Sequence, residues 1–173
     1  IQWVEGKYYR QLAKERTVKN FTIPANKGNV YSADGSLLAT SIPEYSIYFD
    51  AVAPSNEHFK EHIKGLSDSL AVMFDNSTGF YQAKLQKARA NKSRYVFLAK
   101  KLSYTEQMRM KTFPLFNKGA NKGGLIVEQK IVREHPIGLV AKRTIGYERS
   151  NEDGKGLEYA FRHYLNGKSG HRM

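Results

Sequence analysis

The chain has 173 residues, of which 40% are hydrophobic and 12% aromatic, so it can bury a core in one domain or two small lobes. It contains no cysteine, which excludes a disulfide scaffold and a thiolate metal site. Lys and Arg number 28 against 16 Asp and Glu, and the formal net charge of +12 raises the question of an anionic partner. No apolar run approaches the roughly 20 residues that a membrane span requires.

The first segment, residues 1–22, is predicted to lead into the domain as a helix, because Val4, Tyr8 and Leu12 recur at helical spacing. Trp3 lies where apolar residues give way to polar ones, a position that a membrane interface favours. Two interpretations remain open for this start. A transmembrane helix precedes Ile1, or the chain begins after a cleaved signal or at an arbitrary boundary and Trp3 is an ordinary core residue.

A tight β-hairpin is predicted next, because Asp34 and Gly35 separate two short apolar runs, residues 29–33 and 36–40. Both residues tolerate the positive φ angles of a two-residue type I′ turn. A separate strand is predicted over residues 45–50, where apolar residues alternate between Pro43 and Pro54.

Three helices are predicted in the middle of the chain. Ser55 can cap the first, whose apolar face contains Phe59, Ile63, Leu66, Leu70 and Met73. A second, more basic helix covers residues 80–90. Residues 103–106 form a capping box that begins a third helix, which ends near Pro114.

Two strands accompany these helices. Residues 94–100 alternate, which places Tyr95, Phe97 and Ala99 on one face and predicts that both rings lie in the core. A glycine-rich loop over residues 117–124 leads into a long strand, residues 125–133.

The end of the chain is predicted to turn and then form a helix. Pro136 and Gly138 end the long strand. Apolar residues recur at helical spacing over residues 154–167, and Gly167 is predicted as the C-cap of this amphipathic helix.

Helices and strands alternate without a strict βαβ rhythm, which predicts the α+β class. We expect an elongated mixed domain with an N-terminal β-hairpin, a helical lobe over residues 54–124, and a long strand that pairs back near the C-terminal helix. The lobe is inserted between the hairpin and the long strand, and the whole domain covers residues 23–173.

Three stretches carry a family resemblance: residues 23–40, 133–147 and 154–170. In their order and spacing they resemble the N-terminal pedestal, or dimerisation, domain of class B penicillin-binding proteins, the single-span transpeptidases that cross-link bacterial peptidoglycan. Lys27, His135 and Arg143 replace the family's usual Arg, Tyr and His. The residues that match the family pattern are Lys27, Gly28, Asp34, Gly35, Arg133, Pro136, Gly138, Gly146, Gly156, Glu158 and Gly167.

The resemblance implies a stiff, non-catalytic support that holds a transpeptidase domain away from the membrane. It implies a position on the outer side of the inner membrane, anchored by an N-terminal helix, and partners among the glycan polymerase and the divisome membrane proteins, with self-association possible. No cofactor is implied. The connection over residues 148–153 is shorter than elongation-type members usually have, so the division type is predicted.

The residues themselves give no catalytic site. The family's catalytic set needs Ser-x-x-Lys, Ser-x-Asn and a Lys-Thr-Gly strand, and the chain contains neither of the first two motifs. Lys168, Ser169 and Gly170 resemble the third motif, but they follow a predicted helix where the family has a glycine-rich exit.

A nucleic-acid-binding domain is the alternative that the charge raises. Seven basic residues occur between Lys84 and Lys101 without an intervening acid, and Tyr95 and Phe97 lie among them. Basic residues neutralise phosphates, and aromatic rings stack on bases. Against this interpretation, the chain has no RNP-like motif, no glycine-rich nucleic-acid loop and no zinc-finger spacing.

A metal site is not expected, although residues 58–62 match the H-x-x-E-H pattern of inverted zinc metalloproteases. Phe59 and Ile63 define the buried face of the predicted helix, which leaves His58 and His62 at its edge. The sequence identifies no third ligand.

We further expect the first and third stretches to be joined by an ion pair between Lys27 and Glu158, with Arg133 as the competing partner of the carboxylate. The alternative role for Glu158 is that of an acidic residue that stabilises a helix N-terminus.

Overall fold

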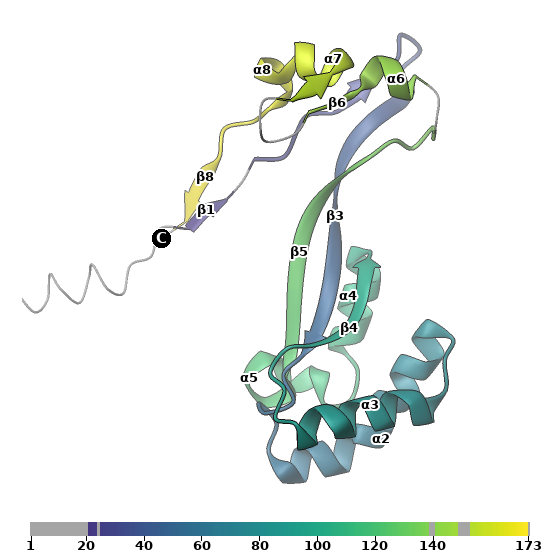
Figure 1. The fold of residues 1–173 in the computed structure, drawn as a ribbon, viewed down its shortest axis with the longest axis vertical. Coiled ribbons are helices and arrows are strands. Elements are labelled where there is room, and N and C mark those ends of the chain that lie inside the picture. Colours follow the sequence, from purple (N-terminus) through teal and green to yellow (C-terminus); the bar gives the residue numbers. More distant parts are fainter. Residues whose placement is uncertain (1–20, 24, 139–140, 149–152, 173) are drawn as a thin grey trace, which may run out of the picture. The chain divides into compact units, whose positions relative to one another are not determined.

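A computed structural model describes residues 21–23, 25–138, 141–148 and 153–172 (Figure 1). Helices and strands are mixed, and the strand pairs that have a register are antiparallel, which confirms the α+β class. The chain divides into two compact units: residues 1–41 with 133–173 form unit 1, and residues 42–132 form unit 2. The predicted leading helix falls on residues 1–20, outside the described residues. Within the described part, no helix combines the length and apolar character needed to cross a membrane.

Unit 2 contains a hydrophobic core between helices and a sheet. Helices α2 (Asn56–Phe74) and α3 (Thr78–Ala90) pack against each other (Figure 1). The long strand β3 (Leu37–Phe49) pairs with β4 (Val96–Leu102) and with β5 (Leu125–Glu134). The largest fully buried core residues come from β3, from α2 and α3, and from the segment after β4, and include Ile47, Phe49, Leu66, Leu70, Leu85, Met110 and Phe116. Strands β4 and β5 add Leu98, Ala99, Leu102 and Leu125, which are also buried.

The helix starts of unit 2 follow the predicted caps. The Ser55 hydroxyl accepts from the His58 backbone N–H at 3.2 Å and begins α2, as predicted. The capping box of Ser103 and Glu106 begins α4 (Tyr104–Lys111) and is confirmed. The predicted glycine-rich loop instead contains a short 3₁₀ helix η1 (Phe116–Lys118) and α5 (Gly119–Gly123).

Strand β3 corrects the prediction of a hairpin strand followed by a separate strand. It runs without a break through Pro43. Strand β2 (Val30–Tyr31) pairs with Leu37 and Ala39, whereas β4 pairs with residues 45–49, so Pro43 lies between these two pairings. The missing proline N–H therefore breaks neither of these two ladders.

The hairpin turn also differs from the predicted two-residue type I′ turn. Ser32 and Ser36 close the loop, and the Gly35 N–H donates to the Ser32 carbonyl at 3.0 Å. Gly35 has φ +83°, but Asp34 does not have a positive φ. A three-residue loop of this kind combines an ordinary turn with one left-handed glycine, so only Gly35 requires conformational freedom.

The prediction that Tyr95 and Phe97 lie in the core is wrong. They are 53% and 43% exposed, whereas Leu98 and Ala99 are both buried. The β3–β4 register shifts twice between Tyr45 and Tyr48, so strict alternation along β4 fails. The two rings instead contact Tyr48, with Tyr48 and Tyr95 stacked at 4.0 Å between ring centroids.

Unit 1 is built from short elements. Strand β1 (Phe21–Ile23) pairs with β8 (Gly170–Arg172), so segments near both ends of the chain lie side by side (Figure 1). Strand β6 (Tyr147–Glu148) pairs with β7 (Gly154–Lys155). The helices are α6 (Lys142–Ile145), α7 (Gly156–Ala160) and α8 (Arg162–Leu165).

The predicted C-terminal amphipathic helix is two short helices, α7 and α8, separated at Phe161. Leu157, Phe161 and Tyr164 are 36%, 51% and 88% exposed, so the apolar repeat does not form a buried face. The buried residue of α7 is Glu158, which means that a polar contact holds this segment. Gly167 is not the C-cap, since α8 ends at Leu165 and its C-cap is Asn166, which has an extended conformation.

Candidate functional site

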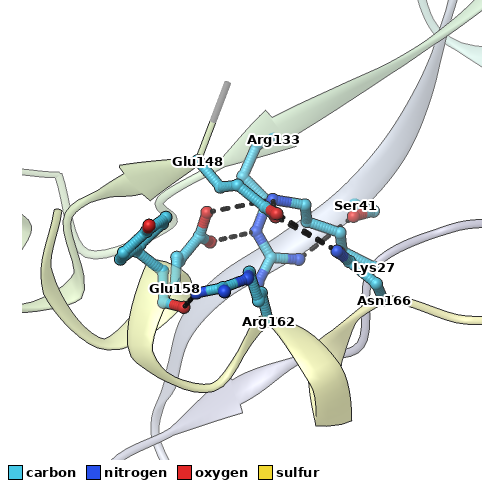
Figure 2. Close-up of polar contacts among 8 residues, drawn as sticks. Lys27, Ser41, Arg133, Glu148, Glu158, Arg162 and Asn166 are labelled. Atoms are coloured by element: carbon cyan, nitrogen blue, oxygen red, sulfur yellow. Dashed lines mark hydrogen bonds and ion pairs between the residues drawn. The ribbon is translucent and has the colours of Figure 1, made fainter. Parts of the chain in front are cut away.

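Four charged residues of unit 1 lie together: Lys27, Arg133, Glu148 and Glu158 (Figure 2). They come from the segment before β2, from β5, from β6 and from α7. We call them the charged cluster. Two cations face two carboxylates, so the formal charges of the cluster balance.

Arg133 and Glu158 form the most buried contact of the cluster. Arg133 Nε lies 2.6 Å from Glu158 Oε1, and the Glu158 side chain is only 3% exposed. Arg133 Nη1 also donates to the Ser41 hydroxyl at 3.0 Å. Its Nη2 is buried without a hydrogen-bond partner among the described residues. The buried Glu158 carboxylate needs the Arg133 guanidinium as its partner, because removing one member of the pair leaves the other charge desolvated.

Lys27 is held mainly by Glu148, which sequence reasoning missed. Their charged atoms are 2.5 Å apart, whereas Lys27 Nζ lies 3.8 Å from Glu158 Oε2. Arg133, expected only as the competing partner, therefore makes the shorter contact with Glu158. The fork geometry of a guanidinium suits a carboxylate better than a single ammonium does.

Backbone pairing explains why Lys27 reaches Glu148. Lys27 forms an isolated antiparallel bridge with Asn166, and the Gly28 N–H donates to the Leu165 carbonyl at 2.8 Å. The Asn166 amide in turn donates to both Glu148 oxygens at 3.2 and 3.3 Å. No spacing in the sequence signals this contact, since the partners are brought together by tertiary pairing.

The cluster also affects proton affinity. The Lys27 ammonium lowers the pKa of the Glu148 carboxyl, with the Asn166 amide acting in the same direction. Glu148 therefore stays ionised to lower pH than an ordinary glutamate. Beside the cluster, the Arg162 guanidinium lies 4.5 Å from the ring centroid of Tyr159 and donates to the carbonyl of that residue at 3.2 Å (Figure 2).

Gly146 and Gly156 allow two backbones to meet beside the cluster. Both have positive φ, +71° and +77°. A Cβ on Gly146 would lie 1.8 Å from the Lys155 carbonyl oxygen, and one on Gly156 would lie 2.5 Å from that of Thr144. A side chain at either position is excluded by both conformation and space.

Other residues of the family pattern lie in turns or where two segments of backbone pass close to each other. The Asp34 carboxylate accepts hydrogen bonds from the Ser32 hydroxyl and from the Ser36 N–H, and these bonds lower its pKa. Pro136 lies in the turn in which the Gly138 N–H donates to the His135 carbonyl at 2.9 Å. A Cβ on Gly167 would lie 3.0 Å from that of Ala25.

The two histidines of α2 have no further potential metal ligand grouped with them among the described residues. The His58 and His62 rings are 6.3 Å apart at their centroids. No group of three or more potential metal ligands occurs in the part of the chain that the structure describes.

Comparisons with known proteins agree with the sequence resemblance. A family model of the penicillin-binding protein dimerisation domain matches residues 22–173. Two relatives, both described as a probable peptidoglycan D,D-transpeptidase PenA, come from Neisseria meningitidis serogroups A and B. Each is 24% identical over 173 residues, which cover 98% of this chain and 27% of the relative.

A solved structure shows the same fold. The crystal structure of penicillin-binding protein 2X from Streptococcus thermophilus matches with a TM-score of 0.65 and 20% identity, over 90% of this chain and 25% of that one. This chain thus spans only about a quarter of the length of these proteins. Because the family model covers nearly all of it, the chain belongs to the family of penicillin-binding protein dimerisation domains.

Proposed function

We propose that this chain is the non-catalytic pedestal of a peptidoglycan transpeptidase that acts in septal cell-wall synthesis. The observation that carries the proposal is the charged cluster, which joins segments around residues 27, 133, 148 and 158. Contacts between segments so distant in sequence restrict the backbone in several places at once. A domain that supports an enzyme needs a stiff backbone of this kind. The same contacts do not by themselves create a catalytic site.

The proposed absence of catalysis in this domain rests on the motifs that its sequence lacks. It has no Ser-x-x-Lys and no Ser-x-Asn, so it has no acylation site of the penicillin-binding type. We expect the purified chain to remain unlabelled by fluorescent penicillin, while the complete protein is labelled. Stoichiometric labelling of the chain alone would contradict this part of the proposal.

The proposed location is the outer side of the inner membrane. Residues 1–22 would then form the membrane-proximal entry and residues 23–173 the pedestal, anchored by a single N-terminal span. The proposed partners are the glycan polymerase and divisome membrane proteins. Leu157, Phe161 and Tyr164 are exposed on α7, α8 and the residue between them, and they offer an apolar surface for such a partner.

The decisive experiment uses the complete protein in the bacterium that encodes it. Glu158→Ala should impair septation at the restrictive condition of a depletion strain, while purified full-length protein is still labelled by fluorescent penicillin. The matched control is Glu134→Ala, because Glu134 is exposed on β5 and has no ion pair among the described residues. Normal septation with Glu158→Ala would refute the proposed supporting role.

The nucleic-acid alternative is tested separately because Tyr95 and Phe97 are exposed near Lys84, whose ammonium lies 5.7 Å from the Phe97 ring centroid. We expect only weak, salt-sensitive binding of a single-stranded oligonucleotide, as any basic protein shows. Tight binding that Tyr95→Ala and Phe97→Ala remove would favour the alternative.

A further inference from the structure

Unit 2 contains a cavity of about 600 Å³ that has no role in the charged cluster. Strand β5 contributes Leu125, Val127 and Gln129, which alternate onto one face, and β3 contributes Tyr45. Helix α4 and the η1–α5 segment provide the remaining walls. The size is that of an ordinary ligand pocket, roughly 300 to 1,000 Å³.

The floor of this cavity combines apolar side chains with one unpartnered amide. Phe116 and Leu125 are 1% and 6% exposed and belong to the hydrophobic core. Gln107 lines the same space and is only 3% exposed. Among the described residues, no group forms a hydrogen bond with the Gln107 side chain, yet neither of its polar atoms is fully enclosed by protein. Because these atoms reach the solvent in the cavity, the donors and the acceptor of the amide are available to a ligand.

The rim is aromatic, amide-bearing and basic. Tyr45 and Tyr104 form two walls, with ring centroids 6.3 Å apart and planes inclined by 55°. Asn117 and Gln129 add two exposed amides, and Lys111 adds an ammonium that has no ion pair in the described part of the chain. No acidic residue lines the cavity within the described residues. The lining therefore favours an anionic ligand that also carries amide groups.

We propose that this cavity binds the end of a short peptide that terminates in a free carboxylate. Lys111 pairs with the carboxylate, Gln107 hydrogen-bonds to a peptide amide, and a small apolar side chain packs on Phe116 and Leu125. Neutral sugars fit less well, because the lining has no carboxylate to accept bonds from several hydroxyls. The inference does not depend on the proposed function, since cell-wall peptides and protein tails share this chemistry.

The test is a titration of the full 173-residue chain with four probes, in which binding is measured by calorimetry and by NMR of the backbone amides. The probes are N-acetyl-D-alanyl-D-alanine, its L,L counterpart, and the C-terminal amide of each. We expect saturable binding of a carboxylate form, shifts confined to α4, η1, α5 and β5, and binding of the amide forms weakened about tenfold or more. Preference for the D,D peptide would identify a cell-wall peptide as the ligand. Preference for the L,L peptide would identify the C-terminal tail of a protein. Equal binding of both would show that the pocket recognises only the carboxylate and amide groups that they share.

Two variants separate binding from folding. Gln107→Met preserves volume and removes an unpartnered amide, so it should lower affinity about tenfold while the Tm stays at or above that of the parent. Lys111→Met should abolish the difference between carboxylate and amide probes. Lys64→Met is the control, because Lys64 is likewise an exposed helical lysine, on α2.

Three outcomes would overturn the inference. They are the absence of saturable binding by every probe, equal affinity for carboxylate and amide forms, and a lower Tm for Gln107→Met without a change in affinity. The last would show that Gln107 has only a structural role.

Discussion

At the scale of single residues, Glu158 is the member of the charged cluster whose loss should matter most. Its side chain is 3% exposed and lies within 2.6 Å of Arg133 and 3.8 Å of Lys27. Burial of this carboxylate is tolerable only because both cations are near. The sequence identified all three residues by motif but ranked Lys27 ahead of Arg133 as the partner of Glu158, whereas Arg133 makes the shorter contact, because these distances depend on how β5 and α7 pack.

Replacing Glu158 with Gln should lower the free energy of unfolding by about 3 kcal/mol, since Arg133 would be left partly buried and without its carboxylate. Urea denaturation of parent and variant measures the difference. Glu134→Gln should change stability by less than about 0.5 kcal/mol, as an exposed substitution does. Equal stability of Glu158→Gln and the parent would show that the ion pair contributes nothing.

The pH dependence of stability should report the pairing of Lys27 with Glu148. The pKa of Glu148 is lowered in the folded state from its ordinary value of 4.5, so its stabilising contribution is present above that value and is lost as the pH falls through the folded pKa. We expect the free energy of unfolding to decrease between about pH 6 and about pH 3, and to decrease less in Lys27→Met.

The comparison of the two proteins isolates the contacts of Lys27, which are a short one with Glu148 at 2.5 Å and a longer one with Glu158 at 3.8 Å. Asp34 and Glu106 also have lowered pKa values, caused by hydrogen bonds from Ser32 and Ser103, and they contribute equally to both proteins. Identical pH profiles for parent and Lys27→Met would mean that neither Glu148 nor Glu158 is stabilised by Lys27.

At the scale of elements, local signals predicted the starts of helices better than the faces of strands. Ser55 and the Ser103 capping box act within one turn of chain, so the sequence contains all that is needed to place them. Tyr95 and Phe97 were assigned to the wrong side because register shifts in β4 arise from its pairing with β3. The apolar repeat in residues 154–167 predicted a single amphipathic helix wrongly for a similar reason. Burial in this segment depends on the contacts of Glu158 in the charged cluster and not on an apolar helix face.

The backbones at Gly146 and Gly156 approach each other too closely to admit a side chain at either position. Gly146→Ala should destabilise the chain by at least about 3 kcal/mol, because the new Cβ would lie 1.8 Å from the Lys155 carbonyl oxygen and the residue has φ +71°. Thermal unfolding checks this expectation. Gly79→Ala is the control: its Cβ meets nothing within 4 Å, and helix propensity should raise stability by up to about 1 kcal/mol. Similar Tm values for both variants would contradict the argument from close approach.

At the scale of the whole molecule, the two units differ in how they are stabilised. Among the described residues, the buried apolar side chains outside residues 42–132 are Ala39 and Ile145. Unit 2 therefore depends on a hydrophobic core, and unit 1 on strand pairing, close glycine contacts and the charged cluster. Fold class and most element positions followed from periodicity and turn residues, whereas this division between apolar and polar stabilisation did not.

Self-association, which the family description suggests, should depend on salt. Copies that each carry a formal charge of +12 repel one another, and the screening length falls from about 10 Å at 0.1 M to about 3 Å at 1 M ionic strength. We expect sedimentation equilibrium to show a larger dimer fraction at the higher ionic strength. A dimer fraction that falls with salt would indicate that attraction between charges, and not apolar contact, joins the copies.

Local patterns and ordered motifs were sufficient to predict the α+β class, the N-caps of α2 and α4, the long strand β5 and the family, because each depends on residues close together in the chain or on the order of motifs. The folded arrangement was needed to find that Arg133 and not Lys27 is the nearer partner of Glu158, that Glu148 completes the cluster, and that Gln107 lies in a cavity without a hydrogen-bond partner among the described residues. Those features depend on side chains from separate segments meeting at distances of a few ångströms, and local sequence patterns do not specify such distances.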